Sequence, residues 1–499
     1  MPDLHRAWDV IVVGGGNAAL CAAITAKQAG RSVLLLEAAP RERRGGNSYF
    51  AGGGVRFPHS GLDDLVALMP ELEAAAAQVD VPKYSVEDYY DDMGQDTNYL
   101  SDPDTLATLI DGARGAVGFL HEQDIRFNWS LGRHAYAVDG RYVFPPGLAV
   151  NVAGAGAGLV DGLFEVAERL EIGIAYETRL TSLEVDSSGA ITGLRCDTPD
   201  AVGLLLSSPR VILACGGFES NPALRAQYLG PNWDIARVRG TKFNMGAGLQ
   251  AALAIGAEPF GNYSGCHAVQ SDANLPWIGD RSVGDLFARH SYPFGVVVNK
   301  HAQRFFDEGA DFQPHTYAKY GREVLRQDDA IAYQIFDADG SKLTRAEYHH
   351  RRTTHEEAGS ITELAKKLEL DAEVLERTIA EYNAALVPDV AFNPNILDGK
   401  RTAGISPAKS NWALPITSPP FHAYPVTTGI TFTFGGLHVD GDARVLRLDG
   451  QPIEGLYAAG EIVGGLYFHN YPSGTGLMAG TVFGRIAGAS SAAAASERS

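Results

Sequence analysis

The chain opens with a short apolar run that ends in three glycines. Val10–Val13 is apolar without interruption, as in a parallel strand that is buried on both faces. After the glycines, residues 17–29 form an alanine-rich stretch that another glycine ends, which is typical of a helix. A second apolar run, residues 32–36, ends at Glu37. This pattern predicts a strand–helix–strand unit, and right-handed crossovers between such units build a doubly wound sheet.

Comparable patterns recur along the chain. Residues 209–217 repeat an apolar run that ends in paired glycines, and residues 455–461 place another apolar run before a glycine and a glutamate. The apolar spacing also predicts helices over residues 159–172 and 478–489, an amphipathic helix pair over residues 361–385, and short strands over residues 191–194 and 204–206. The last ten residues, 490–499, are rich in alanine and serine, and we expect them to fray.

The texture of the sequence changes between residues 263 and 425, where histidine, tyrosine, arginine and proline become more frequent. After that segment the sequence again has the apolar pattern that is typical of strands. We therefore predict an α/β protein with a Rossmann-like nucleotide-binding domain built from both chain ends, residues 1–262 and 426–499, and an inserted α+β domain, residues 263–425. A chain of 499 residues is long enough for two or three domains.

Composition narrows the classes of function. The chain has 60 acidic and 41 basic residues and a formal charge of −19, which argues against nucleic-acid binding and against a polybasic membrane surface. Its four cysteines form no C-x-x-C pair, which excludes the usual iron–sulfur, c-type haem and zinc-ribbon motifs and argues against a disulfide framework. The opening residues do not read as a signal peptide, and no run reaches the ~18 apolar residues of a membrane span. We expect a cytoplasmic enzyme without membrane insertion or a metal site.

The opening unit carries a phosphate-binding motif. Gly14 and Gly16, with Ala19 in the third position, allow a tight turn that brings backbone N–H groups and a helix N-terminus to a pyrophosphate. Glu37 can accept hydrogen bonds from both hydroxyls of a ribose. The alternative is a glycine-rich turn followed by an ordinary surface acid, and the flanking strand and helix favour the nucleotide site.

A second nucleotide signal lies near the other end of the chain, where Glu461 follows a strand and a turn. In a two-part FAD site such a segment brings an acid to the ribityl hydroxyls and a helix N-terminus to the flavin pyrimidine. Rossmann dehydrogenases that use NAD complete their nucleotide site within the first half of the chain. The pairing of the two ends therefore favours FAD.

Several segments together resemble one flavoprotein superfamily. They are residues 13–20, 36–41, 45–48, 212–218, 292–295 with Val298 and Asn299, 304–308 and 459–461. In this order the chain resembles the fumarate reductases, succinate dehydrogenases and 3-ketosteroid dehydrogenases, and most closely the FAD-dependent tricarballylate dehydrogenase type. The resemblance spans nearly the whole chain. It implies an FAD domain from both termini and a mobile capping domain that closes over the substrate.

The resemblance also implies which residues hold FAD. Residues 45–48 would wrap the flavin phosphate and ring edge, Gly216 and Gly217 would meet the adenosine, and Gly476 and Leu477 the pyrimidine. Many quinone-coupled members join FAD to a histidine near this first loop, but residues 45–54 contain none, so we expect noncovalent FAD. The expected cofactor-binding residues are Gly14, Gly16, Asn17, Ala18, Glu37, Ala38, Gly45, Gly46, Asn47, Ser48, Gly53, Gly54, Leu180, Gly216, Gly217, Gly460, Glu461, Gly474, Gly476 and Leu477.

The chain departs from the family at the substrate end. Soluble fumarate reductases carry a proton-donating arginine where this chain has Phe312 beside Asp311. They also hold a substrate carboxylate with a histidine and an arginine, at positions that correspond here to Thr431 and Tyr471. Tricarballylate-type enzymes carry several arginines after the first glycine loop, and this chain has only Arg56 there. These changes argue against a plain fumarate reductase.

Two residues keep a resemblance to the family's substrate site. His267 resembles a histidine that touches a substrate carboxylate or carbonyl, and Tyr471 resembles a tyrosine that polarises a ketone. Each has a structural alternative, as a buried core histidine and as a ring packed over the flavin. The expected catalytic residues are Tyr471, His267, Tyr292, Arg289, Arg281 and Asp311, with Asp280, His290, Tyr317 and Tyr320 as further candidates and Tyr136 and Tyr142 facing the pocket from the other side.

The expected function is that of an FAD-dependent oxidoreductase acting on a CH–CH group next to a carbonyl or carboxylate. Hydride would pass between flavin N5 and the β-carbon of a small molecule, with an external electron donor or acceptor. A polycarboxylate enzyme of the tricarballylate or fumarate type, a flavin oxidase or hydroxylase, and an electron-transfer flavoprotein subunit stay open as alternatives. The hydroxyl, imidazole and aromatic groups left at the site predict a preference for ketones or monocarboxylates over succinate and fumarate. Arg281 and Arg289 are the residues that would overturn this preference by clamping a second carboxylate.

Overall fold

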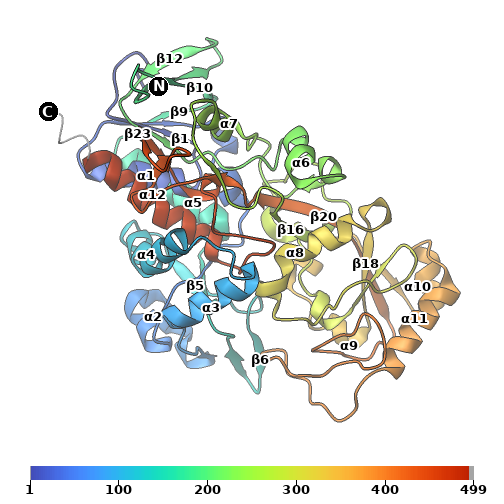
Figure 1. Cartoon of the computed structure of the whole chain (residues 1–499). Coiled ribbons are helices and arrows are strands. Elements are labelled where there is room, and N and C mark those ends of the chain that lie inside the picture. Colours follow the sequence, from blue (N-terminus) through green and yellow to red (C-terminus); the bar gives the residue numbers. More distant parts are fainter. Residues whose placement is uncertain (1, 494–499) are drawn as a thin grey trace.

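The computed structural model describes residues 2–493, and the fold is mixed α/β, as predicted (Figure 1). A central sheet has the order β22-β23-β13-β1-β2-β9, and all neighbours are parallel except β22 and β23. Strands from both ends of the chain therefore lie side by side in it. Its strands are β1 (Val10–Val13), β2 (Val33–Leu36), β9 (Gly173–Ala175), β13 (Val211–Leu213), β22 (Arg444–Leu446) and β23 (Pro452–Ala458).

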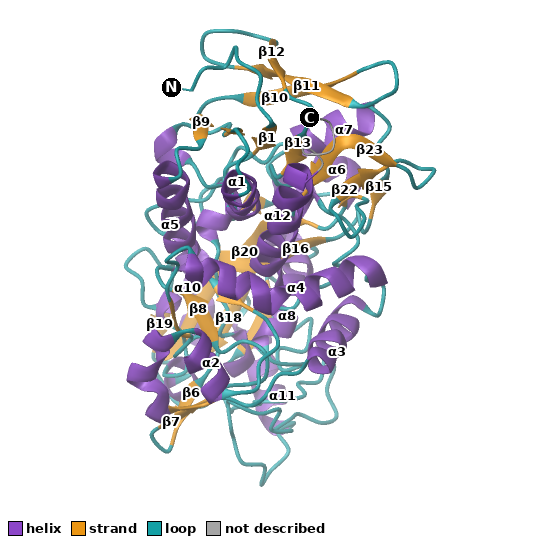
Figure 2. Ribbon diagram, turned by 90° about the vertical axis from the view of Figure 1, so that its left-hand side faces the viewer, coloured by secondary structure: helices purple, strands orange, loops and turns teal. Residues whose placement is uncertain are grey.

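Helices α1 (Asn17–Gln28) and α12 (Thr475–Ala493) pack on this sheet, and α5 (Ala155–Arg169) packs against α1 (Figure 2). The predicted helices over residues 17–29, 159–172 and 478–489 are confirmed with shifted ends. Because α12 continues through Ala493, the expected fraying is wrong for residues 490–493. Residues 494–499 lie outside the described residues.

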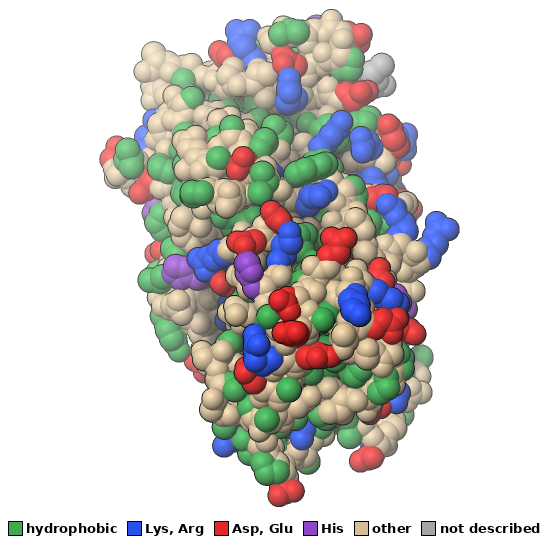
Figure 3. All heavy atoms as spheres, turned by 90° about the vertical axis from the view of Figure 1, so that its right-hand side faces the viewer, with side chains coloured by type: hydrophobic (Ala, Val, Ile, Leu, Met, Phe, Trp, Pro, Cys, Tyr) green, Lys and Arg blue, Asp and Glu red, His purple; other side chains and the backbone are tan. Residues whose placement is uncertain are grey.

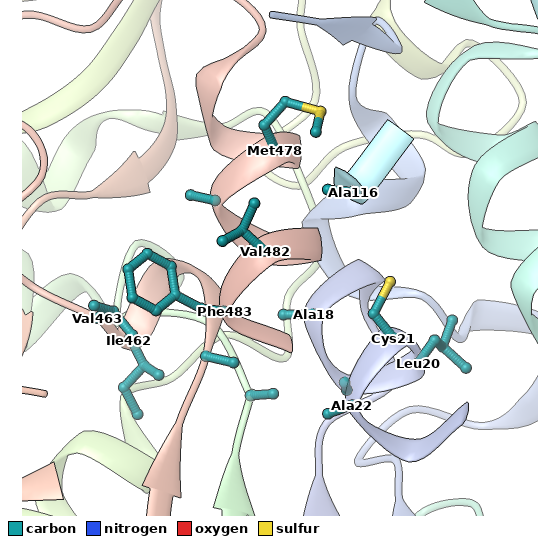
Figure 4. Close-up of a cluster of buried hydrophobic side chains, with 14 of the residues drawn as sticks. Ala18, Leu20, Cys21, Ala22, Ala116, Ile462, Val463, Met478, Val482 and Phe483 are labelled. Carbon is teal, nitrogen blue, oxygen red and sulfur yellow. The ribbon is translucent and has the colours of Figure 1, made fainter. Parts of the chain in front are cut away.

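Glycines bring α12 and α1 unusually close (Figure 4). A Cβ atom on Gly484 would lie 2.5 Å from the carbonyl oxygen of Ala18, and one on Gly488 would lie 2.5 Å from that of Ala22. Larger residues at these positions would push the two helices apart. The last helix is therefore held against the first one, which places the segment before α12 next to the turn before α1.

A second large sheet has the order β14-β20-β18-β17, and β16 and β19 also pair with β20. The 13-residue β20 is its longest strand, and the expected boundary between residues 425 and 426 lies inside it. Helix α8 packs on β16 and β20, and the predicted amphipathic pair forms α10 and α11 at the outer edge (Figure 1). The elements are β14 (Arg237–Val238), β16 (Cys266–Asp272), β17 (Val296–Asn299), β18 (Ala332–Phe336), β19 (Glu356–Ala358), β20 (Phe421–Thr433), α8 (Gln313–Leu325), α10 (Ile361–Lys367) and α11 (Ala372–Ala384).

Smaller elements surround the two large sheets. A three-stranded antiparallel sheet contains β10 (Arg179–Val185), β11 (Ile191–Asp197) and β12 (Leu204–Ser207), the last two as predicted. The other small sheets pair β3 (Gly54–Val55), β8 (Val150–Val152) and β5 (Phe127–Trp129); β4 (Val79–Asp80), β7 (Arg141–Val143) and β6 (Tyr136–Val138); and β15 (Pro259–Phe260) with β21 (Gly436–Leu437). The remaining α-helices are α2 (Leu62–Leu68), α3 (Val86–Thr97), α4 (Pro103–Glu122), α6 (Pro222–Leu229), α7 (Ala247–Ala254) and α9 (Ala338–Ser341).

Two features of the surface and the helices bear on possible partners. Acidic and basic side chains are interspersed on the face drawn in Figure 3. Among the described helices, none has the length and apolar character that a membrane crossing needs.

Candidate functional site

A cavity of about 230 Å³ lies between the central sheet and the second sheet. One group of lining residues consists of the turns that follow β1, β2, β13 and β23, together with residues 46–48 and 51–54 and the start of α12. The other group consists of polar and aromatic side chains from the second sheet, from α8 and from the loop after β5. The carboxyl ends of parallel strands are where open α/β sheets bind ligands.

The turn after β1 can be built only from small residues. Gly14 has φ +120°, and a Cβ atom there would lie 2.2 Å from the carbonyl oxygen of Ala214. A Cβ on Gly15 would lie 2.3 Å from a carboxylate oxygen of Glu37. Helix α1 begins at Asn17, whose N–H donates to the Ser48 hydroxyl at 3.1 Å. Gly16 before it has no side chain that could cap the N–H groups that follow, so these can face an anion in the cavity.

Glu37 is buried at the end of β2, with 5% of its surface exposed. Its carboxylate accepts hydrogen bonds from the backbone N–H groups of Ala39 at 2.8 Å and Gly45 at 3.4 Å. Burial raises the pKa of Glu37, and these N–H groups and the charge of Arg281 partly oppose the increase. The acid is thus held in place at the cavity wall and is not an ordinary surface residue.

A second acidic group lies at the end of β23. Glu461 lines the cavity and accepts a hydrogen bond from the Thr433 N–H at 2.8 Å. Glu219, which is fully buried beside it, accepts hydrogen bonds at 2.6 Å from the side-chain amides of Asn47 and Asn244. Burial raises the pKa of both carboxyl groups, and the charge of Glu461 raises that of Glu219 further. The pair therefore favours the retention of a proton.

Aromatic rings surround the polar end of the cavity. The His267 ring lies 5.0 Å from the Tyr471 ring, 4.8 Å from the Tyr317 ring and 5.1 Å from the Phe432 ring, measured between centroids. The Tyr471 hydroxyl accepts a hydrogen bond from the backbone N–H of Gly476 at 3.2 Å, which leaves its own proton free to be donated. The sequence-predicted pair Tyr471 and His267 is thus brought together at the cavity wall.

His267 is 2% exposed, and its Nδ1 atom has no hydrogen-bond partner among the described residues. Burial and the nearby Arg239 charge lower its pKa well below the ordinary value. The imidazole is therefore neutral at pH 7 and can present one nitrogen to a ligand.

Two arginines that the sequence reasoning missed also line the cavity. Arg133 donates to Asp285 at 2.6 Å, and Arg239 forms an ion pair with the other oxygen of the same carboxylate. Arg239 also donates to the Thr431 hydroxyl at 2.9 Å. In the sequence, Arg239 stands directly before Gly240 and Thr241, and this position does not by itself indicate a ligand-binding residue.

The other four residues expected to be catalytic are not among the described residues that line the cavity. Arg281 lies over the Tyr49 ring and donates to the Arg44 carbonyl at 2.7 Å. The side chain of Arg289 is 1% exposed and is held by the Asp272 carboxylate at 2.7 Å. Neither arginine is therefore placed to clamp a substrate in this structure.

Tyr292 and Asp311 are likewise engaged elsewhere. The Tyr292 hydroxyl is hydrogen-bonded to that of Thr316 at 2.6 Å in the core, and Asp311 accepts from the Phe312 N–H at 2.6 Å. Of the further candidates, only Tyr317 lines the cavity; Asp280, His290, Tyr320, Tyr136 and Tyr142 do not. These residues are of the aromatic and charged types that active sites use, but here they take part in packing and in loop hydrogen bonds.

Most of the expected cofactor-binding residues line the cavity, and two do not. A Cβ on Gly45 would lie 2.5 Å from Val160, so this residue packs against α5. A Cβ on Gly217 would lie 2.1 Å from the Thr433 hydroxyl and 2.3 Å from Glu461, so it lies behind that acid. Both glycines support lining residues from the second layer of the wall.

Comparison with known proteins identifies the wider group. The sequence family described as FAD binding domain matches residues 9–477. The chain is 28% identical to an NADH:acrylate oxidoreductase of Vibrio harveyi, in an alignment that covers 97% of this chain and 50% of that protein. It is also 28% identical to a urocanate reductase of Eggerthella lenta, with 98% of this chain and 75% of that protein covered. The chain thus spans about half the length of the acrylate oxidoreductase.

The fold is shared with a solved structure as well. The open conformation of a flavocytochrome c3 fumarate reductase superposes with a TM-score of 0.74 at 24% identity, over 98% of this chain and 78% of that one. At this identity the likeness concerns the fold.

Proposed function

We propose a function from the premise that this chain belongs to the FAD binding domain family. The protein is an FAD-dependent oxidoreductase that reduces or forms a carbon–carbon double bond next to a carbonyl or carboxylate. One observation carries the proposal. A single cavity joins the glycine turns and Glu37 to Tyr471, His267 and two guanidinium groups. A dinucleotide and a small substrate held in that cavity would be in direct contact.

The residues of the cavity fit FAD. Gly16 and Gly46 leave open space beside the N-terminus of α1, where any other residue would project a side chain. Glu37 lies beside that turn, where a ribose would offer two hydroxyl donors, and Glu461 lies at the other chain end of the site. When bound, FAD supplies hydride exchange at its N5 atom.

The chain's own residues would handle the charge and the proton. The Tyr471 hydroxyl is oriented by the Gly476 N–H, so its proton can be donated to a carbonyl oxygen or to the α-carbon of the substrate. The neutral His267 and the guanidinium of Arg239 offer further donors to the oxygen on which enolate-like charge develops. Donors that are fixed before the reaction stabilise such charge without reorganisation.

We extend the proposal to the arrangement of domains. The central sheet, with strands from both chain ends, would form the FAD domain, and the sheet around β20 would form the cap over the substrate. Arg133 comes from outside that cap sheet, and Arg239 directly follows its strand β14. Substrate contacts would thus be completed where the two units meet.

The FAD is proposed to be noncovalent, because residues 45–54 contain no histidine. Precipitation of the yellow protein with acid should release all of the flavin into the supernatant. Yellow colour that stays with the washed pellet would overturn this part of the proposal.

The substrate class is proposed to be ketone-activated or monocarboxylate compounds. Acrylate and urocanate, named for the two relatives above, each carry one carboxylate. We expect acrylate-type acids or enones to exceed fumarate in kcat/KM by at least ~10-fold, or about 1.4 kcal/mol of transition-state binding. The assay is anaerobic reoxidation of the dye-reduced flavin by a panel of enones, monocarboxylates and polycarboxylates. Fumarate or tricarballylate as the best substrate would contradict the proposal, and a lone chain that turns over none of them would favour the electron-transfer alternative.

A further inference from the structure

Arg133, Arg239 and Asp285 form one connected group at the cavity wall, which we call the Arg–Asp–Arg cluster. Each arginine is hydrogen-bonded to a different oxygen of Asp285. The Arg133 guanidinium lies directly over Gly52, where a Cβ would be 2.1 Å from its Nη2 atom. The cluster therefore sits on the glycine loop of residues 51–54 that lines the same cavity.

The cluster carries one uncompensated positive charge. The charges of Arg239 and Arg133 overcome the effect of burial and hold the pKa of Asp285 well below its ordinary value, so this carboxylate is ionised. Two guanidinium groups and one carboxylate leave a charge of +1. Among the other charged groups near the cluster, Arg345 and Glu347 carry opposite charges and cancel, and Arg56 is paired with Asp92.

The three histidines near the cluster do not change that sum. Burial lowers the pKa of His134, His267 and His290 well below the ordinary value, and the nearby arginines lower each of them further. These imidazoles are neutral at pH 7. The cluster is thus the local source of positive charge at this wall.

One N–H donor of the cluster and one ring nitrogen beside it have no hydrogen-bond partner among the described residues. Arg239 is 6% exposed, and its Nε is without a hydrogen-bond partner among the described residues, as is Nδ1 of His267. A buried N–H group that lacks an acceptor costs about 1–3 kcal/mol. Arg133 keeps 32% of its side chain exposed, and it lines the cavity. An anionic group in the cavity would satisfy these donors and neutralise the charge.

We propose that Arg133 and Arg239 bind the carboxylate of the substrate, that Asp285 is a positioning residue which holds both guanidinium groups, and that the single net charge of the cluster selects monocarboxylates over dicarboxylates. This inference rests on the proposed function and names its substrate subsite. A second carboxylate would find no cation left to pair with, and an unpaired buried carboxylate is strongly disfavoured. Arg239 is also hydrogen-bonded to the hydroxyl of Thr431, which lines the same cavity.

The test measures equilibrium binding to the oxidised, FAD-loaded protein, so that it does not depend on turnover. The probes are propionate, succinate and the neutral propionamide, followed by the change in flavin absorbance and by calorimetry. We expect the wild-type protein to bind propionate at least ~10-fold more tightly than succinate or propionamide. Succinate binding equal to or tighter than propionate binding would overturn the inference.

Three variants probe the roles of the cluster. Arg239→Gln and Arg133→Gln should each weaken propionate binding at least ~10-fold and leave propionamide binding within ~2-fold. Asp285→Asn keeps the shape of the side chain but raises the net charge by one, so the propionate-to-succinate preference should fall at least ~10-fold. The surface variant Asp339→Asn, whose carboxylate pairs with Lys342 at 72% exposure, should match the wild type.

Two readouts separate the possible failures. The flavin-to-protein ratio and the melting temperature identify a variant that has lost its fold, and Arg239→Gln then replaces Asp285→Asn as the deciding variant. Charge-dependent binding without turnover of any compound would refute the proposed function and leave the carboxylate subsite standing. Turnover of enones with binding that is indifferent to probe charge, or charge selection that survives all three variants, would refute the subsite.

Discussion

Removal of the Tyr471 hydroxyl tests whether this residue donates to the substrate. In Tyr471→Phe the ring, which is 6% exposed and packed against His267 and Phe432, keeps its contacts. The oxygen that accepts from the Gly476 N–H at 3.2 Å is lost, together with the proton that it could donate. The loss of one preorganised donor to a developing oxyanion costs about 2.7–4 kcal/mol. We therefore expect kcat to fall roughly 10²–10³-fold.

The same substitution should leave FAD binding almost unchanged, because the ring still fills its place in the wall. Steady-state kcat with the best enone or monocarboxylate from the substrate panel is measured alongside the flavin-to-protein ratio. The control is Tyr89→Phe, since the buried Tyr89 hydroxyl has no hydrogen-bond partner among the described residues and the residue does not line the cavity. A Tyr471→Phe enzyme that retains more than about a third of wild-type kcat would show that Tyr471 only packs in the wall.

Two further predictions concern the cofactor and acid stability. Glu37→Arg should abolish the retention of FAD on a desalting column, because a bulky cation would replace the buried acceptor 2.3 Å from the Cβ position of Gly15. The control Glu42→Arg, which changes an exposed acid in the following turn, should keep its yellow flavin. A Glu37→Arg protein that is as yellow as the wild type would make Glu37 a purely structural acid. Burial lowers the pKa of His59 to about 4, so its contribution to folding is complete above pH 6.5 and is lost as the pH falls toward 4, by about 3 kcal/mol. Urea unfolding of the wild type and of His59→Gln between pH 7 and 4 should show a smaller pH dependence in the variant, and parallel curves would contradict the assignment.

The nucleotide half of the site was predictable because its signals are local. The turn before α1, Glu37 and Glu461 each follow directly from a strand and a glycine, and the chemistry of a tight turn leaves few alternatives. Even Gly45 and Gly217, which do not line the cavity, lie immediately behind its wall. Sequence motifs of this kind specify backbone geometry, and the geometry of the backbone is determined mainly by residues that are neighbours along the chain.

The polar and aromatic side of the cavity was predictable only in part. The resemblance singled out Tyr471 and His267, which line the cavity, whereas Arg133 and Arg239 line it without having been singled out, because arginine is usually a surface residue. Their common partner Asp285 lies 152 residues from Arg133 and 46 residues from Arg239 along the chain. The expected clamps, Arg281 and Arg289, occupy a similar region of sequence but are consumed by a backbone carbonyl and by Asp272. Such a cluster depends on tertiary contacts that no periodicity encodes.

The length of β20 has a consequence for how the protein opens locally. This strand pairs with four others, and at its end the Thr433 N–H donates to Glu461 in the cofactor wall. Strand amides protected by the same ladder tend to exchange with solvent deuterium as one cooperative unit. Removal of the flavin should therefore accelerate amide exchange well beyond the cavity, into β16 and β18. Cofactor loading would then act as a folding step for the second sheet, so that a chain without flavin would also have a less stable second sheet.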